Sequence, residues 1–132
     1  MKKCLFIYGN QNIEDLFDSQ PSKINLHAQW IVLKKYLQDK GIELLSQKKL
    51  GSERADLELH LNVWEINRDD YPKFAILSEC KFIHPKNSNV ELLSKYDQVF
   101  SWDSDIVGLP NATKIQLAHP LGSGLVNGFK HR

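Results

Sequence analysis

The residues best placed to do chemistry follow an apolar run in the middle of the chain. Residues 76–87 read ILSECKFIHPKN, so Glu79 ends the run and His84 opens a turn five residues later. A carboxylate at a partly dry position has a raised pKa, which suits a general base. The simpler alternative is that Glu79 caps the turn or pairs with Lys81 or Lys86, and that His84 only forms the turn.

A second acidic pattern, Asp103-Ser104-Asp105, follows a later apolar run. Two aspartates spaced in this way hold Mg²⁺ or Mn²⁺ against a nucleotide diphosphate in one large class of glycosyltransferases, because hard cations prefer oxygen ligands. Aspartates also cap turns, and we favour that interpretation here. The sequence has no CxxC and no HExxH, so we expect no metal site. It also lacks GxGxxG and Walker A motifs, so a self-contained dinucleotide or ATP site is not expected.

Short apolar runs predict the strands that position these residues. Residues 55–63 alternate, which predicts a strand with leucines on one face and polar side chains, including an exposed His60, on the other. Residues 73–78 are nearly all apolar, which predicts a central strand covered on both faces. The remaining predicted strands cover residues 3–8, 42–46, 98–102 and 114–118.

Helices are predicted between several of these strands. Apolar residues recur with the helical period from Leu26 to Leu37, and Gly41 follows as a stop signal. Residues 88–91 have the spacing of a capping box, which predicts a short helix that runs to about Tyr96. Strands that alternate with helices indicate an α/β domain with a mostly parallel sheet. We place this single domain at residues 1–121 and an irregular tail at 122–132.

The carboxyl ends of parallel strands meet at one edge of a sheet, and ligands bind there. Glu79 comes at such an end. The other residues that follow predicted strands are Gly9-Asn10, Trp64-Glu65, Asp103 and His119-Pro120. We therefore expect these side chains to converge.

Composition limits the partners and the location. Lys and Arg number 17 against 16 Asp and Glu, and the basic pairs are scattered, so no basic patch for nucleic acid is expected. The N-terminal apolar run is too short for a signal peptide, and no run reaches transmembrane length. Two cysteines in apolar runs are typical of free thiols in a reducing compartment. We expect a cytoplasmic protein without a membrane span.

The order of motifs in the second half resembles the N-terminal half of family 10 glycosyltransferases. These are the α1,3/α1,4-fucosyltransferases, which include enzymes of bacterial lipopolysaccharide biosynthesis. The matching residues are Ser78-Glu79, the turn Ile83-His84-Pro85-Lys86-Asn87, and Tyr96-Asp97-Gln98-Val99-Phe100-Ser101-Trp102-Asp103. The resemblance covers about residues 70–120. Before residue 70 only the order of elements agrees.

The resemblance implies one half of a GT-B architecture, a Rossmann-like domain that binds the acceptor saccharide. Glu79 stands at the position of the proposed catalytic base, and proximity then assigns His84, Asn87, Asn10 and Trp102 to acceptor binding. The fucose donor is GDP-fucose, which the family binds with a second, C-terminal domain. The motifs of that domain are missing here, so we expect no cofactor in this chain and no transferase activity from it alone. Residues 122–132 would begin the linker to the missing domain.

Two other functions stay open, and with them the question of whether the chain is an enzyme. It could be a non-catalytic Rossmann-like domain that binds a sugar or a protein at the same edge. It could also be an unrelated small α/β enzyme, including one that uses a metal at Asp103 and Asp105.

Overall fold

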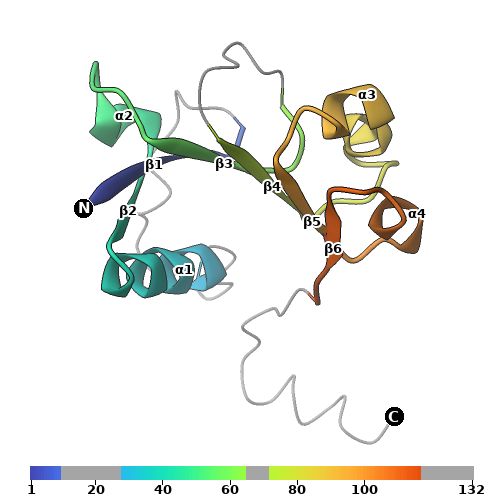
Figure 1. Ribbon diagram of the computed structural model, residues 1–132, viewed down its shortest axis with the longest axis horizontal. Coiled ribbons are helices and arrows are strands. Elements are labelled where there is room, and N and C mark those ends of the chain that lie inside the picture. Colours follow the sequence, from blue (N-terminus) through green and yellow to red (C-terminus); the bar gives the residue numbers. More distant parts are fainter. Residues whose placement is uncertain (10–27, 65–71, 117–132) are drawn as a thin grey trace, which may run out of the picture.

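Six parallel strands form one sheet in the order β2-β1-β3-β4-β5-β6 (Figure 1). The structure is a computed structural model, and it describes residues 1–9, 28–64 and 72–116. All five strand pairings are parallel. The strands are β1 (Lys2–Ile7), β2 (Ile42–Leu45), β3 (Leu57–Leu61), β4 (Lys73–Leu77), β5 (Gln98–Ser101) and β6 (Ala112–Lys114).

Helical segments connect most of these strands and flank the sheet. They are α1 (Ala28–Asp39), α2 (Gln47–Leu50), the 3-10 helix η2 (Pro85–Ser88), α3 (Val90–Leu93) and α4 (Ser104–Val107). The expectation of an α/β, Rossmann-like fold with a mostly parallel sheet is confirmed. The chain order reverses between β1 and β3, and the carboxyl ends of the strands at such a reversal are where open α/β sheets bind ligands.

Each face of the sheet has its own apolar core. On one face, α1 packs on β1, β2 and β3 through Cys4, Phe6, Trp30, Leu44 and Leu59. On the other face, a small cluster under α2 joins Leu5, Leu50 and Ala55. A larger cluster under α3 and α4 includes Ala75, Leu77, Leu93, Tyr96, Val99 and Ile106.

The long helix ends where its sequence predicts. Helix α1 stops at Asp39, and Gly41 follows with a φ of 86°, a left-handed conformation that glycine adopts without strain. The Gly41 carbonyl accepts a hydrogen bond from the Lys2 amide at 3.0 Å. The end of α1 is thereby tied to the start of β1, and β2 begins one residue later, at Ile42.

The prediction that His60 is exposed is wrong. His60 lies in β3, and its side chain is 0% exposed. The alternating pattern predicts a strand with one solvent-exposed face, but β3 lies between β1 and β4 with helices on both sides of the sheet. The polar face of β3 is therefore buried, and its polar groups bond to one another.

Other boundaries differ by a few residues. Asn89, rather than Ser88, caps α3, since Asn89 Oδ1 accepts from the Leu92 amide at 3.2 Å, and α3 ends at Leu93, before Tyr96. The last strand, β6, lies at Ala112–Lys114, earlier than the expected 114–118. Residues 117–132, which contain the expected end of the domain and the tail, lie outside the described residues.

Candidate functional site

Glu79 follows β4 at the carboxyl edge of the sheet, as predicted, and its side chain is exposed. Its main chain is held on both sides: the Glu79 amide donates to Asn62 Oδ1 at 3.0 Å, and the Glu79 carbonyl accepts from Asn87 Nδ2 at 2.8 Å. Within the described ranges, no ion pair joins Glu79 to Lys81 or Lys86. The residue thus presents a carboxylate to solvent from a fixed backbone.

Asn62 is the first of the two residues that hold this backbone. It follows β3 directly and has a φ of 67°, a left-handed conformation that asparagine tolerates better than most residues. This turn lets Oδ1 accept from the Ser78 amide at 2.9 Å as well as from the Glu79 amide. The end of β3 is thereby bonded to the end of β4.

Asn87 is the second, and its side chain is buried. It lies in η2 and is 4% exposed. Its Oδ1 accepts from the Val63 amide at 2.8 Å, and its Nδ2 donates to Asn62 Oδ1 at 3.0 Å and to the Glu79 carbonyl. The amide group is fully engaged with protein partners, so its observed role is to position the turn that carries Glu79.

His84 and Trp64 lie together beside this turn. His84 Nε2 is 2.6 Å from the Val63 carbonyl, so it donates a hydrogen bond, and its ring meets the Trp64 ring edge to face at 4.8 Å. Trp64 also lies close to Gly9, which follows β1, since a Cβ added at Gly9 would lie 3.4 Å from Trp64 Cζ2. Residues after β1, β3 and β4 therefore meet, as expected from parallel strands.

Trp102 follows β5 and is 42% exposed. Its indole N–H donates to the Ser78 carbonyl at 3.4 Å, which places Trp102 next to the residue that precedes Glu79. The partly exposed indole of Trp102 and the exposed carboxylate of Glu79 thus give this edge of the sheet a flat apolar surface and a proton acceptor. This combination suits a polar ligand with apolar faces, such as a sugar ring.

Asp103 and Asp105 form a helix cap. Asp103 Oδ1 accepts from the Asp105 amide at 2.9 Å, and Asp103 is the N-cap residue of α4. This is the turn geometry that we favoured from the sequence. Across residues 1–9, 28–64 and 72–116, no group of three or more His, Cys, Asp or Glu side chains is arranged to hold a metal ion.

Of the residues expected to converge, Gly9, Trp64 and Glu79 lie at this edge, and Asp103 caps α4 after the adjoining strand β5. His84, Asn87 and Trp102, which the resemblance and proximity assigned to acceptor binding, contact the same group of residues. The remaining residues expected at this edge lie outside the described residues, and they are Asn10, Glu65, His119 and Pro120.

A buried polar chain that the sequence did not predict lies under the edge. His60 Nε2 is 3.0 Å from Glu58 Oε2, and His60 Nδ1 is 2.7 Å from the Tyr96 hydroxyl. In the neutral ring, one tautomer satisfies both contacts: Nε2–H donates to Glu58 and Nδ1 accepts from Tyr96. All three residues are buried, with at most 7% of each residue exposed. The sequence does place Glu58 and His60 on the same face of one strand, which could have indicated a buried pair. The alternating pattern instead predicts that this face is exposed to solvent.

Burial raises the pKa of two groups in or near this set of hydrogen-bonded side chains, the Tyr96 hydroxyl and the Cys4 thiol. Burial raises the pKa of Tyr96 to about 12; a hydrogen bond to the Trp64 backbone lowers it and the Glu58 carboxylate raises it further. Burial, and then the Glu58 charge, raise the pKa of the Cys4 thiol to about 12. Both groups stay protonated at neutral pH, so neither is suited to act as a base there.

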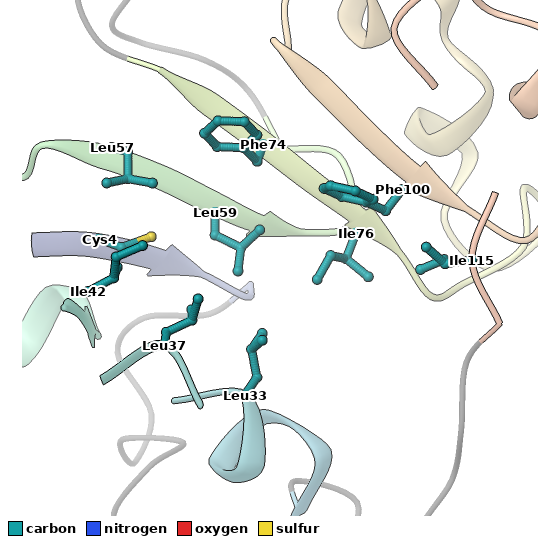
Figure 2. Close-up of a pocket in the computed structure, with 10 residues that line it drawn as sticks. All are labelled: Cys4, Leu33, Leu37, Ile42, Leu57, Leu59, Phe74, Ile76, Phe100 and Ile115. Atoms are coloured by element: carbon teal, nitrogen blue, oxygen red, sulfur yellow. The ribbon is translucent and has the colours of Figure 1, made fainter. Parts of the chain in front are cut away.

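An apolar groove of about 360 Å³ lies on the α1 face of the sheet, apart from Glu79 (Figure 2). In Figure 2, Leu33 and Leu37 of α1 face Leu59 and Ile76 of the sheet across the groove. Of the assigned residues that the structure describes, Glu79, His84, Asn87 and Trp102, none lines the groove. The lining residues are Cys4, Leu33, Leu37, Ile42, Leu57, Leu59, Phe74, Ile76, Phe100 and Ile115.

No family model, curated protein or solved structure matches this chain. Among the helices that the structure describes, none is long and apolar enough to cross a membrane.

Proposed function

We propose that this chain is the acceptor-binding half of a two-domain, inverting glycosyltransferase of the fucosyltransferase type, as in lipopolysaccharide biosynthesis. The observation that carries the proposal is the setting of Glu79. Its carboxylate is exposed at the carboxyl edge of a parallel sheet, while its main chain is held by the buried Asn62 and Asn87. General-base catalysis requires a carboxylate in a fixed position.

In this proposal Glu79 removes the proton from an acceptor hydroxyl while that oxygen attacks C1 of fucose. The new bond forms between C1 and the acceptor oxygen, and the bond between C1 and the GDP oxygen breaks. GDP leaves with the bonding electrons and the proton stays on Glu79. Attack from the side opposite to GDP inverts the configuration at C1. Because Glu79 is exposed, the acceptor and the second domain would exclude water from the site.

The neighbouring residues have separate roles in binding the acceptor. Trp102 offers its exposed ring to the apolar face of a sugar, next to Glu79. His84 is half-buried and lies against Trp64, so it borders the acceptor from the other side. Asn87 positions Glu79 through its buried amide, while its direct contact with the saccharide stays a prediction. Asn10 stays in the proposal on its sequence position alone.

The partners in this proposal are an acceptor saccharide and a C-terminal domain that binds GDP-fucose. The described residues carry no donor motif, so residues 1–132 alone should not transfer fucose, and no cofactor is assigned to them. The near-balanced charge offers nothing that would attract nucleic acid. The free cysteines, Cys4 and Cys80, fit a cytoplasmic location.

Saccharide titration followed by amide NMR tests the binding half of the proposal. The isotope-labelled chain is titrated with N-acetyllactosamine at millimolar concentrations. We expect chemical-shift changes at Glu79, at His84 and at the indole N–H of Trp102. Glu79→Gln should keep these changes because it removes the base but little of the surface, whereas Trp102→Ala should reduce them. Sucrose at the same concentrations is the control sugar.

Two results would contradict the proposal. Shift changes that are absent, or that are equal for sucrose and N-acetyllactosamine, would remove the acceptor site. Clear turnover of GDP-fucose by residues 1–132 alone would remove the claim that the chain is half an enzyme.

The second candidate function is a non-catalytic domain that binds a protein partner. The observation that favours it is the apolar groove on the α1 face, which is of a kind that marks interaction sites. A chain that shows no saccharide response but forms a defined oligomer or complex would support this candidate.

A further inference from the structure

Half of the large apolar side chains that the structure describes as exposed lie on the segments that follow β4 and β5. Phe82 is 86% exposed and Ile83 is 71% exposed, and they are neighbours in the turn that joins β4 to η2 (Figure 1). Val90 of α3 and Trp102 after β5 are the other two. Single exposed apolar residues are ordinary, whereas an exposed apolar surface rimmed by polar groups marks contact with a partner or a membrane.

The charge around this apolar pair has one sign. Residues 80–90 contain two lysines and one histidine but no acidic residue. Lys81 is exposed, and its Nζ lies 5.6 Å from the centre of the Phe82 ring, so an ammonium group stands beside the apolar pair. The acidic residues Glu79 and Glu91 lie just outside this segment. The turn therefore suits a partner that combines negative charge with an apolar interior.

The main chain of the turn is closed on itself and anchored at its base. The Cys80 carbonyl accepts hydrogen bonds from the Ile83 amide at 3.1 Å and from the His84 amide at 2.9 Å. The Glu79 carbonyl accepts from Asn87, so the turn begins at a fixed position. Internal hydrogen bonds leave fewer backbone groups unpaired when a turn enters an apolar phase. A turn that is already ordered also loses little conformational freedom on binding.

We propose that residues 81–83 are a membrane-docking turn, in which Phe82 and Ile83 enter the interface of an anionic lipid bilayer and Lys81 pairs with a headgroup phosphate. Apolar side chains beside lysines bind such interfaces because apolar burial and electrostatic attraction act together. A stable protein interface instead buries about 800 Å² on each side. A buried aromatic side chain supplies roughly 150–250 Å², so two side chains fall well short of that area.

The position of the turn sets the orientation of the docked domain. Glu79 precedes Lys81 by two residues, and the Trp102 indole N–H donates to the Ser78 carbonyl at 3.4 Å. The carboxyl edge of the sheet therefore faces the bilayer when the turn is inserted. Trp102 then lies close to the headgroups, where indole rings are commonly found.

Vesicle flotation of the unaltered chain tests this proposal. Residues 1–132 are mixed at low salt with vesicles of equal parts phosphatidylglycerol and phosphatidylcholine, or with vesicles of phosphatidylcholine alone, and floated through a density gradient. We expect the chain to float with the anionic vesicles and several-fold less with the neutral ones. A chain that does not float with the anionic vesicles, or that binds both kinds equally, overturns the proposal.

Matched double variants locate the contact. Phe82→Ser with Ile83→Ser removes the apolar pair of the turn. Val32→Ser with Tyr36→Ser removes two exposed apolar side chains of α1 and is the control. We expect the first double variant to lower the fraction bound to anionic vesicles several-fold and the control to leave it near the unaltered level. Circular dichroism checks that both variants fold. Equal binding by the two double variants overturns the proposal.

A charge reversal tests the electrostatic part of the contact. Lys81→Glu should lower binding to the anionic vesicles several-fold, whereas Lys35→Glu, at an exposed lysine of α1, should change it little. Equal losses would mean that only the overall charge of the chain matters, which overturns the role of the turn.

Sedimentation without lipid tests for a different occupant. A dimer of the unaltered chain that Phe82→Ser with Ile83→Ser dissociates would overturn the proposal, because the turn would then contact a second copy. None of these readouts involves a saccharide or GDP-fucose, so the membrane proposal and the proposed function fail independently.

Discussion

Asn62 Oδ1 lies 3.0 Å from Asn87 Nδ2, and this hydrogen bond joins the loop after β3 to the turn after β4. The same Oδ1 accepts from the Glu79 amide, and the same Nδ2 donates to the Glu79 carbonyl. Two buried asparagines thus hold the main chain of one exposed glutamate. Asn62 Oδ1 and both polar atoms of the Asn87 amide bond to protein groups, so the arrangement fixes the direction in which Glu79 leaves the sheet.

Replacement of Asn62 separates its hydrogen bonds from its backbone conformation. Glycine adopts a φ of 67° without strain, so Asn62→Gly would be neutral or stabilising if conformation were the reason for asparagine here. We instead expect Asn62→Gly to lower the free energy of unfolding by about 1–3 kcal/mol, because the amides of Ser78 and Glu79 lose their acceptor. Urea unfolding followed by circular dichroism measures the difference.

Asn62→Asp is the matched control because it keeps the accepting oxygens. It should retain the amide shifts of Ser78 and Glu79 in NMR spectra, whereas Asn62→Gly should move both. A glycine variant as stable as the unaltered chain would show that the hydrogen bonds of Asn62 contribute nothing to folding.

The Tyr96 hydroxyl completes the buried set of hydrogen bonds that joins Glu58 and His60 of β3. Tyr96→Phe removes the hydroxyl that bonds to His60 Nδ1 at 2.7 Å and leaves a buried ring nitrogen without its partner. We expect a loss of about 1–3 kcal/mol in the free energy of unfolding, measured by urea titration. Tyr36→Phe is the control, since Tyr36 is 58% exposed on α1 and should change stability by less than about 0.5 kcal/mol. Equal losses from both variants would contradict the role assigned to the Tyr96 hydroxyl.

The raised pKa values of Tyr96 and Cys4 make stability fall at alkaline pH. Both groups have folded pKa values of about 12, against ordinary values of 10.0 and 9.0. The unfolded chain therefore releases these protons first, so their contribution is intact below about pH 9 and is lost as the pH rises towards 12. The free energy of unfolding, measured from pH 8 to 11, should fall less steeply for Tyr96→Phe than for Tyr36→Phe. Parallel curves for the two variants would show that Tyr96 does not contribute to the alkaline loss.

Most strands were predictable because they combine apolar content with a clear stop signal: Gly41 precedes β2, and the polar Ser78 follows β4. The last strand was misplaced because β6, Ala112–Lys114, has little apolar content. These local patterns were enough for the α/β class. They do not determine strand order, so the reversal between β1 and β3 did not follow from the sequence. The prediction that residues 73–78 are covered on both faces holds for one face of β4 only, since Phe74 and Ile76 are half-buried while Ala75 and Leu77 are buried.

The candidate site was predictable in position but not in its internal bonding. Glu79 was expected at the carboxyl edge because strand ends converge there, whereas His84 and Trp102 were assigned through the family resemblance and proximity. The role of Asn62 was missed because its polar side chain continues the alternating pattern of residues 55–63. The pattern does not show that the backbone turns into a left-handed conformation at this residue. His60 was misplaced because alternation reports the polarity of a face and not whether another element covers it.

The two free cysteines should differ sharply in reactivity. Cys4 is buried and 1% exposed, and burial followed by the Glu58 charge raises its pKa to about 12. Cys80 is only half-buried, in the turn after Glu79. Because the thiolate is the reactive form, iodoacetamide at pH 8 should modify one thiol of the folded chain and both thiols in denaturant. Mass spectrometry of the peptides should place the first modification on Cys80, and Cys80→Ser should leave the folded chain unmodified. Modification of Cys4 at a similar rate in the folded chain would show that β1 opens readily, which would contradict its place in the core beneath α1.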